Sequence, residues 1–253
     1  MRAISALFAS QTWNAQTYER RFGFVSRFGR PVLEFLPPPP CSVLDIGCGD
    51  GALAREMLDA GYTVKGVDFD QGMLARARER GVDVAHGDAQ LGLPAGPFDA
   101  VLTNAALHWM PDQNAVARHV SDALESGDAF VGECGGYGNC AGVRDAIAEV
   151  VGHDVEAELC SWTFPAPEAF RNILTANGFI VDKIEHFERP VACDAVEWLQ
   201  QFGSVYIPKD RPDAFLDEFR ASAKRHLKPA TTDQGRQGVW VDYVRLRWRA
   251  TKA

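Results

Sequence analysis

Short apolar runs alternate with amphipathic stretches along the first half of the chain. Buried strands of a parallel sheet read as continuous apolar runs, whereas helices repeat apolar residues every three or four positions. The two kinds of segment follow one another here, which predicts strand–helix units that build a parallel sheet with helices on both faces. The expected strands are 42–46, 62–68, 82–86, 98–104 and 128–134, and the expected helices are 52–60, 71–80 and 112–124.

The alternation becomes less regular after residue 135. Apolar residues at helical spacing still mark amphipathic helices, and two late apolar stretches complete the sheet. The expected helices are 141–151, 167–177, 194–202 and 212–227, and the late strands are 179–187 and 239–250.

Three parts of the chain follow from this pattern. We expect an N-terminal helical lid over 1–36 and a helical cap insertion over 188–238. The remaining residues, 37–187 and 239–253, form the Rossmann-like core.

The stretch Val43–Gly51, VLDIGCGDG, is an apolar strand that runs into a glycine-rich turn and opens a helix. Glycine allows a tight turn and lets a ligand approach the backbone closely. Gly47, Gly49 and Ala52 also satisfy the dinucleotide pattern G-x-G-x-x-G/A, and Asp68 lies near the distance expected of a ribose ligand. A nicotinamide-dependent oxidoreductase is therefore one candidate.

The charge of the loop separates the candidates. A dinucleotide places its diphosphate at the helix N-terminus, where the helix dipole is positive. Asp45 and Asp50 flank this loop, and two carboxylates repel a diphosphate. They favour a ligand that carries an ammonium and a sulfonium group, as S-adenosylmethionine (SAM) does.

Several motifs then resemble, in order, those of the class I SAM-dependent methyltransferases. The resemblance is greatest to the trans-aconitate methyltransferase-like group of small-molecule enzymes. It implies a Rossmann-like fold with a mostly parallel seven-stranded sheet, SAM as the cofactor and S-adenosylhomocysteine as its product. The motifs are VLDIGCGDG, VKGVD ending at Asp68, Gly87-Asp88-Ala89 and Asn104–Trp109, with WNAQTY at 13–18 and DYVRLR at 242–247.

The resemblance also implies which residues contact SAM. The first motif lies against the methionine part, and Asp68 accepts hydrogen bonds from both ribose hydroxyls. Apolar side chains cover the adenine, and Asp88 accepts from its amino group. The implied set is Asp45, Gly47, Cys48, Gly49, Asp68, Phe69, Met73, Asp88, Ala89 and Asn104, with Trp13 and Tyr18 on the lid.

Some of these residues also have purely structural explanations. Gly-Asp is common turn chemistry, which accounts equally for Asp88. Met73 fits a core position, and Trp13 and Tyr18 fit ordinary helix packing.

His108 and Trp109 are the candidate catalytic residues. An imidazole titrates near neutral pH, so His108 is the natural general base for an alcohol, a phenol or a protonated amine. With a carboxylate acceptor, which is already anionic, His108 only positions the substrate. Trp109 supplies an apolar wall beside it.

The composition of the chain excludes some classes of binding partner. Lys and Arg total 26 against 34 for Asp and Glu, a formal net charge of -8, which disfavours nucleic acid. No apolar run approaches the roughly 20 residues of a membrane-spanning helix. The six cysteines are scattered without a CxxC pair, which indicates reduced thiols, no metal site and a cytoplasmic protein. A monomer is the default, and a homodimer is possible.

The sequence therefore predicts a SAM-dependent methyltransferase that acts on a small-molecule carboxylate, hydroxyl or amine. A nicotinamide-dependent oxidoreductase and a non-catalytic SAM-binding protein are the alternatives.

Overall fold

The computed structural model describes residues 28–160 and 162–253. Of the predicted lid, only the last residues belong to this part of the chain. Trp13 and Tyr18 lie outside the described residues.

The described chain divides into two compact units. The larger unit comprises residues 28–137, 162–187 and 245–253, and the smaller unit comprises 138–160 and 188–244.

The larger unit is built on a seven-stranded sheet in the order β3-β2-β1-β4-β5-β10-β6. Neighbouring strands from β3 to β5 run parallel, and β10 runs antiparallel to β5. This confirms the predicted, mostly parallel α/β sheet. The strands are β1 Ser42–Ile46, β2 Thr63–Asp68, β3 Asp83–His86, β4 Phe98–Asn104, β5 Leu124–Gly135, β6 Phe179–Glu188 and β10 Val244–Lys252.

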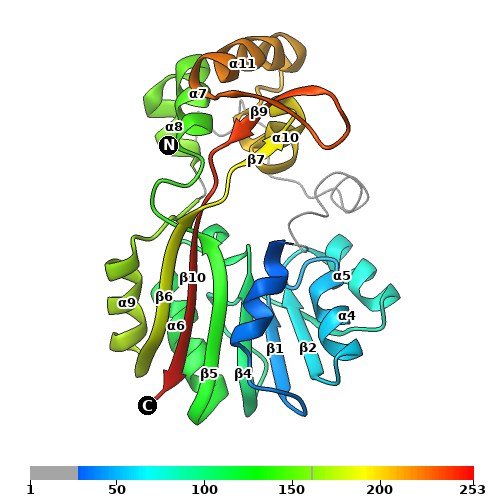
Figure 1. Ribbon diagram of the computed structural model, residues 1–253, viewed down its shortest axis with the longest axis vertical. Coiled ribbons are helices and arrows are strands. Elements are labelled where there is room, and N and C mark those ends of the chain that lie inside the picture. The colour runs from blue at the N-terminus through cyan, green and yellow to red at the C-terminus, as the bar shows by residue number, and fades with distance from the viewer. Residues whose placement is uncertain (1–27, 161) are drawn as a thin grey trace. The chain divides into compact units, whose positions relative to one another are not determined.

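Both faces of this sheet are covered (Figure 1). Val32, Met57 and Ala77 pack with alternate strand residues on one face. Val116 and Phe170 pack on the opposite face, as the alternation of strand side chains requires. The covering elements are η1 Arg30–Phe35, α4 Ala52–Asp59 and α5 Gln71–Glu79 on the first face, and α6 Gln113–Ala123 and α9 Pro167–Ala176 on the second.

The strand directions bring distant segments to one edge of the sheet. The carboxyl ends of parallel strands lie together, and an antiparallel strand places its amino end beside them. The ends of β1, β2, β4 and β5 therefore meet the start of β10 at what we call the carboxyl edge. Ligands of open α/β sheets bind at this edge.

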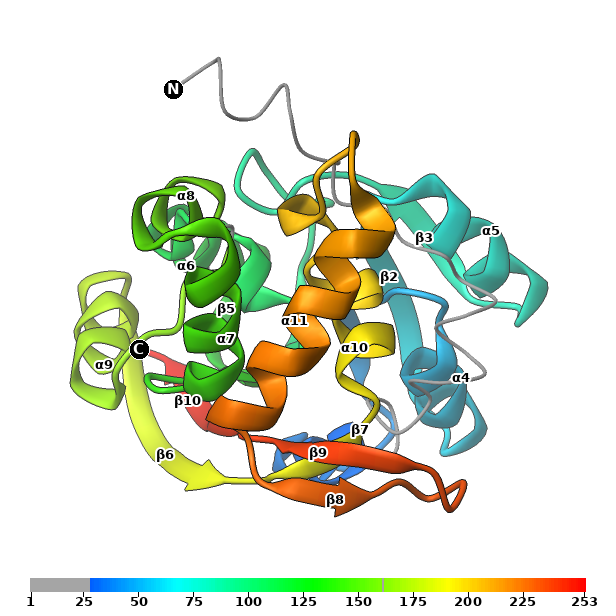
Figure 2. The ribbon, with the colours of Figure 1, turned by 90° about the horizontal axis from the view of Figure 1, so that it is seen from above.

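The smaller unit combines helices with a three-stranded antiparallel sheet in the order β7-β9-β8. Figure 2 shows α11 lying beside α7 and α10, and these helices are in contact. The elements are α7 Ala141–Val151, α8 His153–Leu159, β7 Val191–Cys193, α10 Ala195–Phe202, η3 Ser204–Tyr206, α11 Pro212–His226, β8 Pro229–Thr231 and β9 Gln237–Val241.

Two features of this unit differ from the sequence prediction. The expected strand 239–250 is two strands, because Asp242 and Tyr243 bond within the smaller unit. Asp242 accepts from the N–H of Gly142 at 2.8 Å, and Tyr243 from the indole of Trp198 at 2.6 Å.

The second difference concerns α7 and α8, which the contacts group with the later segment and not with the core. Glu149 on α7 contributes to this association. Its carboxylate accepts hydrogen bonds from Ser222, Arg225 and His226 on α11. Among the described residues, no helix combines the length and apolar character needed to cross a membrane.

Candidate active site

The glycine-rich turn follows β1 at the carboxyl edge. Gly47 and Gly49 have φ of +70° and +55°, in the left-handed region that favours glycine. A Cβ at Gly47 would lie 2.2 Å from the Cβ of Ala106, whereas a Cβ at Gly49 would meet no atom of the described residues within 4 Å. Gly47 is therefore fixed by packing against the protein, and Gly49 borders open space.

Two carboxylates lie beside this turn. Asp68, at the end of β2, accepts hydrogen bonds from the N–H groups of Gly49 and Asp70, both at 2.9 Å. Asp45, on β1, is 2% exposed, and no hydrogen bond or ion pair joins its carboxylate to another residue of the described chain. Burial, with the nearby charge of Asp68, raises the pKa of Asp45 to about 7. Burial raises the pKa of Asp68 as well.

Asp50 does not add to this negative charge as the sequence suggested. Its carboxylate forms an ion pair with the guanidinium of Arg80 at 2.9 Å, and Arg80 also donates to its carbonyl oxygen. The excess negative charge therefore comes from Asp45 and Asp68. The pairing partner lies 30 positions away and comes near only in the folded chain.

The predicted adenine-side residues follow β2 and β3. Phe69 is 57% exposed, directly after Asp68, and Met73 is buried in the first turns of α5. Ala89 packs in the core. Asp88 accepts from the backbone N–H of Gln90 at 2.9 Å, so it also serves the turn that follows β3.

Cys48 and Asn104 complete the predicted cofactor set. Cys48 is buried, and its backbone N–H donates to Val67 at 3.1 Å, which holds the turn against β2. Burial raises the pKa of its thiol. Asn104 ends β4, and its side-chain oxygen is buried without a hydrogen-bond partner in the described chain. A Cβ at Gly29 would lie 2.3 Å from its amide nitrogen, so a larger residue there would displace the Asn104 side chain.

His108 and Trp109 lie on η2 Leu107–Trp109, after β4. His108 is 8% exposed, and the centroid of its ring lies 5.7 Å from that of Trp109 and 5.8 Å from that of Phe164. Its Nδ1 accepts a hydrogen bond from the backbone N–H of Gly135 at 3.2 Å. Burial, and then the charge of Arg245, lowers the pKa of His108 well below its usual value.

This bond fixes the state of the imidazole. A backbone N–H can only donate, so Nδ1 of His108 is the unprotonated nitrogen and Nε2 carries the proton. The neutral ring therefore offers an N–H donor, and its accepting lone pair is already used by Gly135.

Sequence reasoning missed a buried charged cluster at the same edge. Glu133, on β5, is 1% exposed and bonds to Arg245 and Arg247 on β10. Its sequence signal was weak: a single carboxylate in an otherwise apolar strand, with arginines alternating along VRLRWRA. Its two arginines are opposite in charge to the carboxylates of Asp45 and Asp68.

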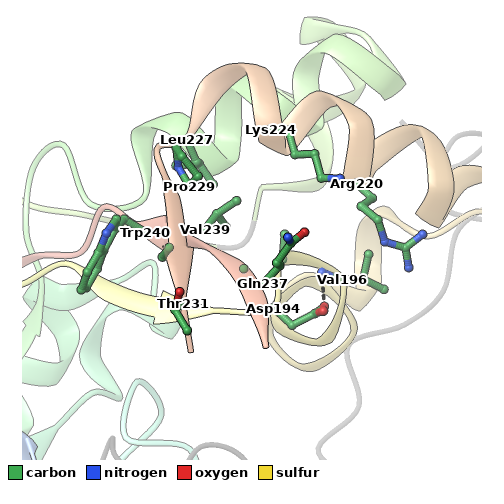
Figure 3. A pocket seen from close by; sticks show the side chains of 13 residues that line it. Asp194, Val196, Arg220, Lys224, Leu227, Pro229, Thr231, Gln237, Val239 and Trp240 are labelled. Carbon is green, nitrogen blue, oxygen red and sulfur yellow. Dashed lines mark hydrogen bonds between the residues drawn. The ribbon is translucent and has the colours of Figure 1, made fainter. Parts of the chain in front are cut away.

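The smaller unit has a groove of its own, with a volume of about 870 Å³ (Figure 3). Arg220 and Lys224 on α11 lie at one side and Trp240 on β9 at the other. Asp194 caps α10 by accepting from the N–H of Val196, and Arg220 pairs with Asp217. The groove shares no residue with the carboxyl edge.

Comparison with known proteins decides the family. The chain matches the family model described as a methyltransferase domain over residues 44–132. It is 31% identical over 261 residues to the "uncharacterized methyltransferase C70.08c" of Schizosaccharomyces pombe, a match that covers 95% of this chain and 98% of that protein. The chain belongs to the class I SAM-dependent methyltransferases. SAM is its methyl donor, and family membership sets aside the oxidoreductase that the glycine pattern had left open.

Another sequence relative is a methyltransferase, and two solved structures share the fold. The trans-aconitate 2-methyltransferase of Mycolicibacterium gilvum is 28% identical, and the match covers 83% of this chain and 87% of that protein. The YcgJ protein of Bacillus subtilis has the same fold, with a TM-score of 0.64 at 18% identity, covering 91% of this chain and 98% of that chain. A SAM-dependent methyltransferase of Mesorhizobium loti has a TM-score of 0.55 at 21% identity, with 88% and 96% covered.

The residues of this methyltransferase fit SAM chemically. SAM carries two positive groups, and Asp45 is a buried carboxylate without a partner in the described chain. Open space above Gly49 leaves the backbone accessible, and Asp68 has the oxygens that two adjacent hydroxyls require.

Proposed function

We propose that this methyltransferase transfers the methyl group of SAM to a carboxylate of a small organic acid, by in-line displacement. The observation that carries the proposal is the hydrogen bond from Gly135 to Nδ1 of His108, which leaves the imidazole neutral and without a free accepting nitrogen. An alcohol, phenol or protonated amine needs a base before it can attack. A carboxylate needs none, because it is anionic at neutral pH.

The relatives support the same acceptor class. Several carry the name trans-aconitate 2-methyltransferase, and trans-aconitate is a carboxylic acid. The sequence similarity to one of them extends over 83% of this chain.

Under this proposal the cofactor residues have distinct tasks. Bound SAM supplies a methyl carbon that its positive sulfur has activated. Asp45 offsets the positive charge, Asp68 holds the ribose, and the backbone at Gly47, Cys48 and Gly49 lies against the methionine part. Phe69, Met73, Asp88 and Ala89 surround the adenine, and Asn104 lies between cofactor and acceptor.

The acceptor side then needs alignment more than proton transfer. His108 donates from Nε2 to the acid, and Trp109 excludes water beside it. Holding reactants in a near-attack arrangement can contribute about 7–11 kcal/mol to lowering a barrier. Such a site requires rigid donors, and the packed ring of His108 is one.

The chemical nature of the product tests this proposal. The protein is incubated with SAM labelled in the methyl group and with trans-aconitate, a phenol or a primary amine. We expect label in trans-aconitate alone, as a methyl ester. Mild alkali hydrolyses methyl esters and should therefore release the label as methanol. Label that survives alkali as a methyl ether or N-methyl group would contradict the proposal.

A further inference from the structure

The buried cluster on β5 and β10 holds two guanidinium groups, of Arg245 and Arg247, and the single carboxylate of Glu133. The partly exposed carboxylate of Glu185 lies 4.0 Å from Arg247, so Arg245 is the group whose charge is in excess. Oε1 of Glu133 accepts from Nε of Arg245 at 3.1 Å, and Oε2 accepts from Nε and Nη2 of Arg247 at 2.9 and 2.7 Å. Two guanidinium groups thus share one carboxylate. Arg245 is 7% exposed and Glu133 is 1% exposed, so little solvent reaches either charge.

The two arginines differ in how well they are satisfied. Arg247 uses two of its nitrogens on Glu133, reaches Glu185 at 4.0 Å, and lies over the rings of Phe35 and Phe187. Arg245 uses only Nε, and its terminal nitrogens have no hydrogen-bond partner among residues 28–160 and 162–253. A guanidinium has five N–H donors, so the terminal nitrogens of Arg245 have donors available for an acceptor.

The register of the sheet places Arg245 at the acceptor side of the site. Arg245 pairs across the sheet with Gly135, whose N–H holds His108. Glu133 lies in register with Asn104 at the end of β4. Arg245 therefore lies opposite the residue that bonds to the imidazole, and its partner Glu133 lies opposite Asn104, which the proposed function places between cofactor and acceptor.

We propose that Arg245 is a positioning residue that binds a carboxylate of the acceptor, and that the acceptor carries a second carboxylate which is methylated. This inference rests on the proposed function. A guanidinium binds a carboxylate through two parallel hydrogen bonds, which occupy its lone pairs and make it a weaker nucleophile. The anchored group is thus not the one that attacks. Glu133 holds Arg245 in orientation, and the proton on Nε2 of His108 provides a further donor.

The test compares acids with one and several carboxylates. Trans-aconitate and crotonate are bound by calorimetry to the full-length protein saturated with S-adenosylhomocysteine. The variant Arg245→Gln should weaken trans-aconitate binding about 10- to 100-fold, the range of a charge-assisted hydrogen-bond pair. Binding of crotonate and of S-adenosylhomocysteine should change less than threefold. Equal losses for both acids, or none, would overturn the inference.

Two further variants guard against a merely structural effect. Arg249→Gln removes an arginine from the same face of β10 that contacts Phe35 and Asp182, away from the carboxyl edge, and should leave both affinities unchanged. Arg245→Lys keeps the charge but loses the planar fork, so it should bind trans-aconitate with intermediate affinity. If Arg245→Gln does not melt cooperatively, the Arg245→Lys variant serves as the test. Wild-type affinity of Arg245→Lys for trans-aconitate would then refute the role of Arg245 in binding a carboxylate.

Binding and chemistry separate the two proposals. If the wild-type protein esterifies both acids equally and Arg245→Gln has no effect, the anchor fails and the proposed function stands. If trans-aconitate binds in an Arg245-dependent manner but no ester forms, the anchor stands and the proposed function fails.

Discussion

The carboxyl edge of the sheet has two ends of opposite charge. At β1 and β2, Asp45 and Asp68 lie close together, and no cation among the described residues pairs with either of them. At β5 and β10, two arginines share Glu133. Both ends bury charge, which a protein interior tolerates poorly without compensation.

Under the two proposals, this difference in charge corresponds to a different ligand at each end. Excess negative charge suits the sulfonium and ammonium of SAM, and excess positive charge suits an acid. Asp50 shows the contrast, because its pairing with Arg80 is complete and leaves no charge for a ligand. The residual charge, not the number of charged residues, therefore predicts the ligand.

The largest expected effect is at the acidic end. Asp68→Asn should weaken SAM binding by about 100-fold or more, because two charge-assisted hydrogen bonds to the ribose are lost or weakened. Calorimetry with S-adenosylhomocysteine measures this. Asp83→Asn, which removes an exposed carboxylate paired with Lys65, serves as the matched control and should bind normally. A change below threefold for Asp68→Asn would remove it from the cofactor site.

The glycine turn provides the next comparison. Gly49→Ala adds a Cβ in open space, so the protein should remain folded with a modest loss of stability of about 1–2 kcal/mol from the left-handed backbone, while SAM affinity falls at least tenfold. Gly47→Ala should lose stability more severely, since its Cβ collides with Ala106. Thermal melts and calorimetry separate the two effects. Unchanged SAM affinity in Gly49→Ala would mean that the ligand lies elsewhere.

Asp45 gives the site a dependence on pH. Its pKa is raised to about 7, so between pH 6 and 7 part of the protein holds a proton there, which a bound cation displaces. SAM affinity should therefore rise as the pH increases through 7, with proton release detectable as a dependence of the binding enthalpy on the buffer. Asp45→Asn should abolish the proton release.

The same carboxylate should weaken the ligand-free fold. For an acid whose pKa is higher when folded, stability falls as the pH rises from the unfolded pKa near 4 towards 7. At pH 8, Asp45→Asn should melt a few degrees above wild type, and the difference should disappear near pH 4. A melting temperature of Asp45→Asn below that of the wild type at pH 8 would contradict the claim that Asp45 is a buried, unpaired charge.

The smallest effect is expected at His108. Gln at this position can accept from Gly135 and still donate, so turnover in His108→Gln should fall less than about tenfold, with an unchanged pH profile between 6 and 8. Removal of a general base typically lowers the rate by about 10²–10⁴-fold. A loss in that range with normal SAM affinity would restore the role of base to His108.

The sequence predicted the sheet well, because buried parallel strands and their helices leave long periodic patterns. It did not predict β7 and β8, which have three residues each and are too short for a clear period, and it merged β9 with β10. It also ran the last strand through Asp242 and Tyr243, whose partners Gly142 and Trp198 lie far along the chain.

The acidic end was predictable and the basic end was not. Asp45 and Asp68 belong to two short motifs that are close together in the sequence. Arg245 and Glu133 are 112 residues apart, and arginines that alternate with apolar residues are typical of a half-exposed strand. That Arg245 is buried becomes visible only in the folded sheet, where β10 pairs with β5.

A crystal structure of the protein with S-adenosylhomocysteine and trans-aconitate tests the central claim most directly. The account predicts ribose hydroxyls within hydrogen-bond distance of Asp68 and one carboxylate of the acid on the terminal nitrogens of Arg245. An acid bound away from Arg245, or a nucleoside that leaves Asp68 without contact, would contradict the division of the edge into a cofactor end and an acceptor end.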